Sequence, residues 1–256
     1  MSLTRLPWLP HEVKIVLFGR RVEMLHPEIE RYANLHIVEA NPDVVISFGG
    51  DGTLLASELK YPGVPKVPIL NSRRGHRCIA HPRAEVLRRL SEGTLIAHLY
   101  MKLDCTVRRY GESQPVRQVT ALNEINVHMG KINSAVRFQL FLNDEPYDDG
   151  TEILGDGFVL CTPFGSTAYF RHITRGIFTQ GIGIAFKATG EAVDHLVVPE
   201  DTVARVLITR GPAVFAYDSA EDYVSLDRGD EVVVRRSEQS ATILTCGPVR
   251  RLNEPF

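Results

Sequence analysis

Apolar and polar positions alternate in two different ways along the chain, and the first hundred residues show strands alternating with helices. Short uninterrupted apolar runs are typical of buried strands, whereas apolar residues three or four positions apart are typical of helices. The runs that predict strands are 13–18, 43–48 and 67–70, and the segments that predict helices are 27–35, 53–60 and 83–90. Pro68 favours an edge or an end for the third strand. This alternation predicts an α/β layer with a parallel sheet.

From about residue 98 onward, apolar positions recur at every second residue, which predicts half-buried strands. Residues 99–107 and 136–142 show this alternation, and Asn143-Asp144 after the second run signals a hairpin. Further strands are expected at 125–127, 158–160, 204–208, 231–234 and 241–244. We therefore predict an α/β domain over 1–98 and a mostly antiparallel β domain over 99–256, whose tail is too short to form a further domain.

The composition narrows the class of protein. The 256 residues carry 29 Lys and Arg against 31 Asp and Glu, a net charge of −2, and 44% are apolar, which excludes a disordered or fibrous chain. The near-neutral balance argues against a dedicated nucleic-acid-binding protein. No apolar run approaches the ~20 residues of a membrane span, and no segment near the first residue resembles a signal peptide. We expect a cytoplasmic protein that binds neither nucleic acid nor membrane.

Cysteine and histidine positions give no metal or hydrolase motif. Cys78, Cys105, Cys161 and Cys246 form no C-x-x-C and have no His at metal-ligand spacing, so buried thiols are expected. Ser166 is not in a G-x-S-x-G motif, and the histidines contain no H-E-x-x-H. Any catalytic metal is therefore expected to be Mg²⁺, held mainly by the phosphates of a donor and by water.

The strongest chemical signal is Gly49-Gly50-Asp51-Gly52-Thr53, between an apolar strand and a helix. Glycines let the backbone approach a ligand closely, and N–H groups at a helix N-terminus favour phosphate. A carboxylate repels phosphate, so Asp51 fits this loop if it takes a proton from a hydroxyl group or binds Mg²⁺. The alternative is a tight strand-to-helix turn with an exposed Asp51.

Two further motifs lie in the second half. The amide and carboxylate of Asn123-Glu124 are able to bracket a ribose or a carboxamide, although the pair alone is more simply a solvated strand end. Gly155-Asp156-Gly157 precedes an apolar strand, which leads into Thr-Pro-Phe-Gly-Ser-Thr-Ala-Tyr at 162–169. Backbone donors, hydroxyl groups and one aromatic ring suit a nucleoside. The alternative is a hairpin corner with a core tyrosine.

Together, the three motifs resemble those of the NAD kinases, also called polyphosphate/ATP-NAD kinases. Residues 49–53 match the GGDGT motif of that family, Asn123-Glu124 match its NE motif, and 162–169 are similar to its TPTGSTAY motif, in the same order and spacing. GGDGT is shared with lipid kinases, whereas the other two motifs distinguish NAD kinases. The resemblance, which covers most of the chain, implies a Rossmann-like N-terminal domain, a β-rich dinucleotide-binding domain and an active site between them.

The resemblance also implies a reaction, the transfer of a phosphoryl group from ATP or polyphosphate to the 2′-hydroxyl of the adenosine ribose of NAD, with a divalent cation such as Mg²⁺. It implies a homo-oligomer, a dimer or a tetramer. Asp51 is the implied general base. The other implied site residues are Gly49, Gly50 and Thr53 at the phosphates, Gly52, Asn123 and Glu124 at the dinucleotide, Asp156 at the nicotinamide-side carboxamide or ribose, and Thr167, Ala168 and Tyr169 at the adenine.

Four positions depart from the family pattern. Leu154 replaces an Arg, Phe164 replaces the second Thr of TPTGSTAY, Arg175 replaces the first residue of a Gly-Gly pair, and Ile79 replaces an aromatic residue. A missing aromatic residue weakens stacking on adenine by about 0.5–1.5 kcal/mol. Because of these departures, the sequence does not determine which phosphoryl donor is used or how fast the reaction is. Two alternative functions remain: a lipid kinase of the same superfamily, and a catalytically weak dinucleotide sensor.

Overall fold

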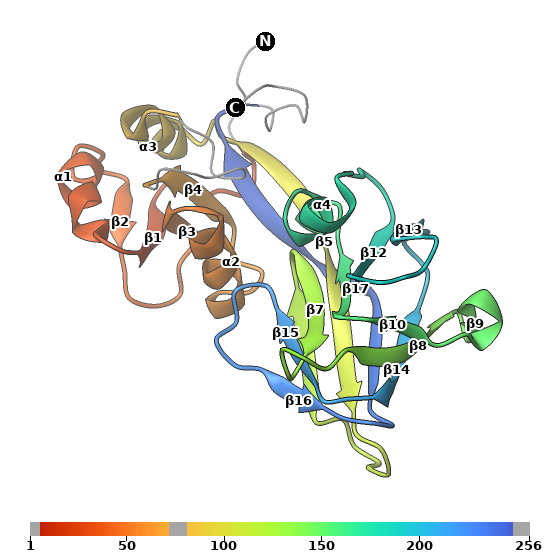
Figure 1. Ribbon diagram of the computed structural model, residues 1–256. Helices are drawn as coiled ribbons and strands as arrows, with labels where there is room; N and C mark the ends of the chain where they lie inside the picture. The colour runs from red at the N-terminus through yellow and green to blue at the C-terminus, as the bar shows by residue number, and fades with distance from the viewer. Residues whose placement is uncertain (1–5, 72–80, 248–256) are drawn as a thin grey trace. The chain divides into compact units, whose positions relative to one another are not determined.

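The computed structural model describes residues 6–71 and 81–247, and the chain divides into two compact units (Figure 1). The first unit comprises Met1–Tyr100 and the chain from Ser240 onward, and the second comprises Met101–Gln239. Each unit has its own core of buried apolar side chains.

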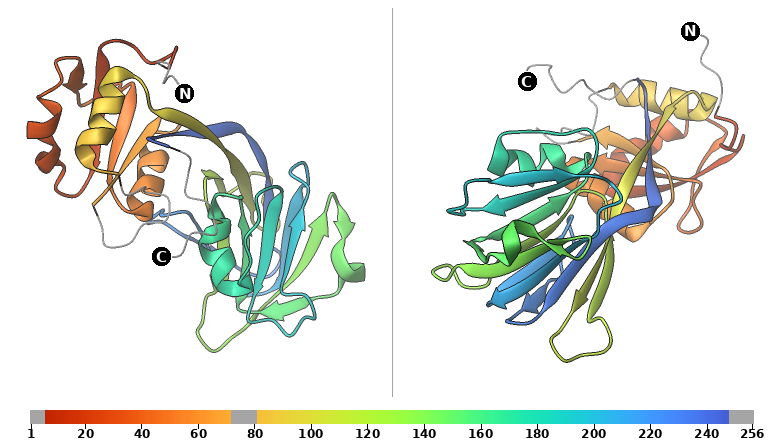
Figure 2. Two further views of the ribbon diagram at one scale, coloured as in Figure 1. Left: turned by 90° about the horizontal axis from the view of Figure 1, so that it is seen from above. Right: turned by 90° about the vertical axis from the view of Figure 1, so that its right-hand side faces the viewer.

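A parallel sheet with the strand order β2-β1-β3-β4 forms the centre of the first unit. Its elements are β1 (Val13–Gly19), η1 (Val22–Leu25), α1 (His26–Ile29), β2 (Leu35–Ile37), β3 (Val44–Gly49), α2 (Asp51–Lys60), β4 (Lys66–Leu70) and α3 (Arg83–Glu92). Helices α1 and α3 pack on one face of the sheet and α2 lies on the other, as Figure 2 shows. The predicted Rossmann-like α/β domain is confirmed.

The sequence of β3 explains its central place. Val44, Val45 and Ile46 are fully buried, as expected for a parallel strand with both faces covered. Pro68 of β4 pairs with Ser47 of β3. On the other side of β4, the C-terminal part of β17 (Glu231–Thr245) pairs at Ile243 and Lys66, two residues before Pro68. Pro68 is thus the middle residue of β4, which has a neighbouring strand on each side, so the predicted edge or strand end is wrong. The pairing with β17 at Lys66 does not involve Pro68, whose missing N–H therefore costs no hydrogen bond there.

The prediction of a helix over 27–35 is wrong in its second half. Helix α1 ends at Ile29, and Leu35 begins β2, where it pairs with Val13. The side chain of Asn34 donates hydrogen bonds to the carbonyl oxygens of His11 and Ser91 (3.0 and 2.9 Å). These contacts hold the segment at the sheet edge, and the apolar pattern alone does not separate a three-residue edge strand from the end of a helix.

Two antiparallel sheets pack face to face in the second unit. One has the order β13-β12-β11-β7-β15-β16, and the other contains β10-β8-β14-β17 together with β5, β6 and β9. Phe138 of β8 and Phe158 of β11 meet in the core between them, with ring centroids 4.8 Å apart. The predicted mostly antiparallel β domain is confirmed. The bounds are β5 (Ile96–Arg108), β6 (Arg117–Ala121), β7 (Glu124–Met129), β8 (Val136–Leu142), β9 (Glu145–Pro146), η2 (Tyr147–Gly150), β10 (Ile153–Gly155), β11 (Gly157–Cys161), η3 (Gly165–Thr167), α4 (Tyr169–Thr174), β12 (Ile182–Lys187), β13 (His195–Val198), β14 (Ala204–Arg210), β15 (Ala213–Tyr217) and β16 (Val224–Leu226).

The hairpin predicted at Asn143-Asp144 is confirmed, since these two residues join β8 to β9. Both have positive φ angles, 52° and 65°. Asn and Asp tolerate this left-handed conformation, which a two-residue hairpin with the usual right-handed strand twist requires.

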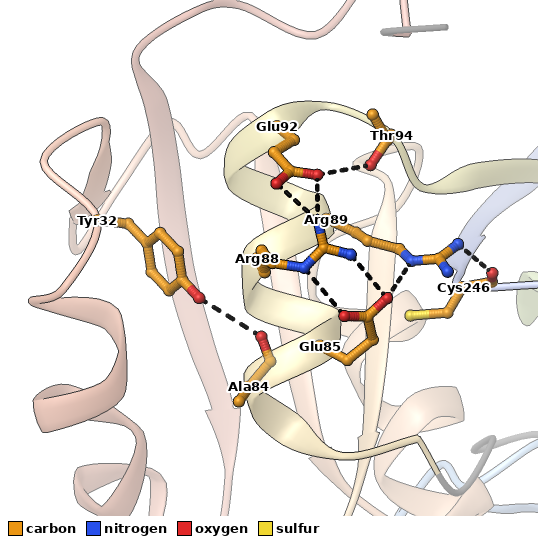
Figure 3. A network of polar contacts seen from close by, with 8 residues as sticks. All are labelled: Tyr32, Ala84, Glu85, Arg88, Arg89, Glu92, Thr94 and Cys246. Atoms are coloured by element: carbon orange, nitrogen blue, oxygen red, sulfur yellow. Dashed lines mark hydrogen bonds and ion pairs between the residues drawn. The ribbon is translucent and has the colours of Figure 1, made fainter. Parts of the chain in front are cut away.

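Helix α3 ties the C-terminal part of the chain to the first unit (Figure 3). Arg88 and Arg89 donate hydrogen bonds to Glu85 and hold the pKa of its carboxyl at about 2, and Arg89 also donates to the carbonyl oxygen of Cys246. With the pairing of Ile243 and Lys66, this contact explains why the chain from Ser240 groups with the first unit. The structure therefore differs from the predicted division 1–98 and 99–256, because β17 leaves the second unit before it ends.

Within residues 6–71 and 81–247, no helix is long and apolar enough to cross a membrane. Cys105, Cys161 and Cys246 are buried free thiols, and Cys78 lies outside the described residues.

Candidate functional site

The loop at 49–53 joins the carboxyl end of β3 directly to the N-terminus of α2. Gly50 is the N-cap in an extended conformation, and its carbonyl oxygen accepts the N–H groups of Thr53 and Leu54 (3.0 and 3.1 Å). A Cβ atom on Gly49 would overlap Oγ1 of Thr53, so this position has no room for a side chain. The glycines thus let the chain turn from strand into helix within one residue, and the helix N-terminus favours an anion.

Gly19, the last residue of β1, lies beside this loop. Its φ is +134°, and a Cβ atom there would overlap the carbonyl oxygen of Phe48 and touch Thr53. The next strand in the chain, β2, pairs with one side of β1, and the strand after it, β3, pairs with the other side. In open α/β sheets, ligands bind at the carboxyl ends of the strands where the strand order reverses in this way. The sequence analysis did not include Gly19 among the site residues, although a glycine ending an apolar strand is a visible signal.

Asp51 is the first residue of α2 and is half-buried, whereas Gly52 is exposed. The helix macrodipole favours a negative charge at this end. The turn from strand to helix is tight, as in the alternative interpretation, but Asp51 is half-buried rather than exposed.

The second and third motifs, 39 positions apart, form one structural unit. The carbonyl oxygen of Asn123 accepts the N–H of Thr162 (3.0 Å), and the Thr162 hydroxyl donates to the carbonyl oxygen of Leu122 (2.6 Å). Gly165 packs so closely that a Cβ atom on it would overlap the backbone of Asn123. The N–H of Gly165 donates to the Thr162 hydroxyl (3.1 Å), which closes the loop onto the start of β7.

Asp218 holds the second motif from the opposite side. Its carboxylate accepts the N–H groups of Leu122 (2.7 Å), Asn123 (2.7 Å) and Glu124 (3.1 Å). Burial raises the pKa of this carboxyl to about 6, although the three N–H groups and Lys102 favour its charged form. Sequence reasoning missed Asp218, which lies about ninety positions away and has no motif around it.

Glu124 is the most unusual group of the site. It is 7% exposed, and its Oε2 atom is buried with no hydrogen-bond partner. Burial and the neighbouring Asp218 raise the pKa of Glu124 to about 8, and Lys187 acts in the opposite direction. Asn123 is also buried, so the alternative of a solvated strand end is wrong. A buried carboxylate oxygen without a donor is suited to accept a hydrogen bond from a ligand.

Lys187, at the end of β12, lies among the predicted dinucleotide-binding residues. Its ammonium donates hydrogen bonds to the side-chain oxygen of Asn126 and to the carbonyl oxygen of Val127, the latter at 2.9 Å. It also lies 5.2 Å from the ring centroid of Tyr169. Burial lowers the pKa of Lys187 to about 8, while Glu124 and Asp156 raise it. Sequence reasoning missed this residue; the only signal was a single charge ending an apolar strand.

The remaining predicted residues border this cluster. Asp156 is half-buried, and its backbone N–H donates to the carbonyl oxygen of Lys187 (2.8 Å). Thr167 and Ala168 are half-buried at the junction of η3 and α4. Tyr169 is 46% exposed, so the alternative of a core tyrosine is wrong. An exposed ring backed by a cation on one side offers its other face for stacking.

Three of the departing positions have clear structural places. Leu154 is exposed on β10, Phe164 is buried, and Arg175 caps the end of α4 in the left-handed conformation with φ 61°. Ile79 lies outside the described residues.

The predicted site residues thus form two groups, each within one unit. The first unit holds 49–53, and the second holds Asn123, Glu124, Asp156 and 167–169. Over the described parts of the chain, no group of three or more His, Cys, Asp or Glu side chains is placed to hold a metal ion.

Comparison with known proteins agrees with the motifs. Residues 122–246 match the model of the ATP-NAD kinase C-terminal domain. The NAD kinase of Clostridium perfringens is 34% identical over 132 residues, which cover 50% of this chain and only 45% of that protein. The NAD kinase of Chloroflexus aurantiacus is 30% identical over 224 residues, which cover 83% of this chain and 78% of the relative.

Solved structures show the same fold at lower identity. Yeast NADH kinase complexed with NADH has a TM-score of 0.79 and 16% identity, with 92% of this chain and 84% of that chain covered. An NAD kinase from Archaeoglobus fulgidus in complex with ATP has a TM-score of 0.72 and 22% identity, with 91% and 92% covered. The fold, the three motifs and the identity to the Chloroflexus aurantiacus protein lead to one conclusion: the chain belongs to the NAD kinase family.

Proposed function

We propose that this protein is an NAD kinase, which transfers a phosphoryl group from ATP or polyphosphate to the 2′-hydroxyl of the adenosine ribose of NAD and so forms NADP. The observation that carries the proposal is the buried Oε2 of Glu124, which has no hydrogen-bond donor and lies on the structural unit formed by the second and third motifs. A ribose hydroxyl group supplies such a donor.

Asp51 is the proposed general base. As the 2′-oxygen attacks the terminal phosphorus of the donor, Asp51 accepts the hydroxyl proton, and the bond from that phosphorus to its bridging oxygen breaks to release ADP or a shortened polyphosphate. Gly49, Gly50 and Thr53 line the turn where the donor phosphates meet the N-terminus of α2, and Gly52, exposed beside Asp51, lets the substrate approach.

The second unit holds the dinucleotide in this proposal. Asn123 and Glu124 bind hydroxyl groups of the ribose, and Asp156 binds the carboxamide or the ribose on the nicotinamide side. Thr167, Ala168 and Tyr169 line the adenine, with the exposed ring of Tyr169 as its stacking surface.

The residues present fit a Mg²⁺ ion that arrives bound to the phosphoryl donor. The Gly-rich turn suits phosphate, and Asp51 is the one carboxylate within that turn, so the donor phosphates and water would supply most of the oxygen ligands. When bound, Mg²⁺ neutralises the charge that develops on the phosphates.

The donor and the assembly are also part of the proposal. The bound ATP in the Archaeoglobus fulgidus structure supports ATP as donor. We expect a cytoplasmic homo-oligomer, a dimer or a tetramer.

The test is a turnover assay with the purified protein, NAD and Mg²⁺, in which NADP is detected with an NADP-specific dehydrogenase. Separate arms supply ATP and polyphosphate, and further arms replace NAD by diacylglycerol or sphingosine. NADP formation supports the proposal. Calorimetric binding of NAD without turnover identifies a dinucleotide sensor instead, and phosphorylation of a lipid without NAD binding identifies a lipid kinase.

A further inference from the structure

Lys187 reaches across a strand to β7, just after the second motif. It belongs to β12, and both acceptors of its ammonium, Asn126 and Val127, belong to β7, while β11 pairs between these two strands. The residue opposite Lys187 on β11 is Gly157, which has no side chain in the way of the lysine stem.

Strand alternation places the lysine on the same face as Glu124. Residues two apart on a strand share a face, so Glu124, Asn126 and His128 lie on one face of β7, and His128 shares its row with Gly157 and Lys187. This face is covered by α4 through an apolar cluster, whose buried members are Val159, Cys161, Phe170 and Ala185.

The ammonium of Lys187 is costly in such a place. It is 7% exposed, and in the described parts of the chain no carboxylate lies within ion-pair distance of it. Burying a charge that is matched only by neutral acceptors is unfavourable. A hydrophobic residue of similar length would pack here without that cost, so the charge calls for a role in the site.

The titratable groups around Glu124 indicate what that role is. Asp218 faces it from the loop after β15, the Cys161 thiol from β11 and Lys187 from β12; Asp156 and the ring of Tyr169 lie near the lysine. Asp218 disfavours a charge on Glu124, and so does burial. Lys187 is the group that favours the carboxylate form.

We propose that Lys187 is a positioning residue of the dinucleotide site, whose ammonium holds Asn126 and the ring of Tyr169 in place and favours the carboxylate form of Glu124, which accepts a hydroxyl hydrogen. The nature of the ligand rests on the proposed function, whereas the effect of Lys187 on Glu124 does not. Asn126 and Lys187 thereby join Asn123 and Glu124 as determinants of dinucleotide affinity.

The test is a titration of Glu124 by NMR in protein labelled with ¹³C at the Glu side-chain carboxyl, with the signal assigned by its loss in Glu124→Gln. In Lys187→Met, the midpoint of Glu124 is expected to move upward by about one pH unit or more, because a favourable charge is lost. Since a tenfold smaller fraction of Glu124 is then charged, the KM for NAD at pH 7 is expected to rise roughly 10-fold, with kcat changed less than about 3-fold.

Lys131→Met is the matched control, since it removes the same charge from an exposed position in the same unit. This control variant should leave the titration midpoint of the Glu124 carboxyl and the KM for NAD unchanged. If Lys187→Met fails to fold, Lys187→Gln removes the charge and keeps an amide donor for Asn126, and it should show the same upward shift.

Two failures are distinguishable. The proposal for Lys187 is overturned if the Glu124 carboxyl titrates with the same midpoint in the wild-type protein and in the folded Lys187 variant. This holds whether or not NAD is phosphorylated. A wild-type protein that neither binds nor phosphorylates NAD overturns the proposed function, even if the midpoint moves as expected.

Discussion

Asp51 and Asn123 are expected to affect different kinetic constants. Asp51→Asn is nearly isosteric and keeps the first turn of α2, but it removes the proton acceptor, so kcat should fall about 10²–10⁴-fold with NAD affinity changed less than ~10-fold. Asn123→Ala removes a binding group and should raise the KM for NAD more than it lowers kcat. Steady-state kinetics of both purified variants provides the measurement. Near-wild-type turnover of Asp51→Asn would remove Asp51 from the mechanism.

The raised pKa of Glu124 should also make the stability of the protein depend on pH. Its pKa is about 8 in the folded protein, above the value of 4.5 for an ordinary glutamate. The folded state therefore binds this proton more tightly than the unfolded state, and the associated stabilisation, complete below pH 4.5, is lost as the pH rises toward 8. Glu124→Gln does not titrate, so its advantage in melting temperature over the wild type should grow from pH 5 to pH 8.5.

Thermal melts of both proteins across this range test that expectation. Asp104→Asn serves as a comparison, because Asp104 is a carboxylate of the same unit that accepts a hydrogen bond, from Thr120 at 2.9 Å. A difference between Glu124→Gln and the wild type that shrinks with rising pH would contradict the interpretation.

At the residue scale, the sequence predicts groups that lie within short motifs and misses those brought in by tertiary structure. Glu124 and Tyr169 follow from local patterns, but the raised pKa of Glu124 depends on its burial and on Asp218, which the motif does not reveal. Asp218 reaches its N–H donors across 94 to 96 positions. A lone Asp in a turn gives no sign of such a contact, since most turn carboxylates are exposed.

The end of α4 carries the clearest conformational strain among the departures from the family pattern. Arg175 adopts φ 61°, a left-handed conformation that costs an L-residue about 1–2 kcal/mol and costs glycine little. Arg175→Gly is expected to raise the free energy of unfolding by about 0.5–1 kcal/mol after the entropy cost of glycine. His172→Gly, inside the same helix, should lower it by a similar amount. Urea unfolding of both variants measures this, and destabilisation by Arg175→Gly would show that the guanidinium matters more than the backbone.

At the element scale, long or strongly patterned segments were predictable and short ones were not. The run at 43–48 and the alternation at 136–142 became β3 and β8, because each satisfies one periodicity over its whole length. The three residues of β2 give too short a pattern, and their pairing with β1 decides their structure. The strand predicted at 241–244 became the end of β17, a strand of 15 residues that no local break signal reveals.

At the scale of the whole molecule, the two-domain organisation follows from the change in periodicity near residue 98, but the path of β17 does not. The chain leaves the second unit at Gln239 and pairs with β4 of the first. This partner lies more than 170 positions earlier, and the free energy of such a long-range pairing has no counterpart in local sequence. The proposed chemistry likewise draws on both units, since Asp51 belongs to one and Glu124 to the other.

Removal of divalent cations should separate catalysis from folding. In 6–71 and 81–247, no cluster of three or more His, Cys, Asp or Glu is placed to hold an ion, and each unit has a core of its own. A structural metal contributes folding free energy directly, whereas an ion that arrives with the phosphoryl donor does not. EDTA is therefore expected to abolish NADP formation, with recovery on excess Mg²⁺, and to shift the melting temperature by less than ~2 °C in circular dichroism. Melting on addition of EDTA alone would instead reveal a structural ion, and the role assigned to the donor phosphates as the main ligands would then be wrong.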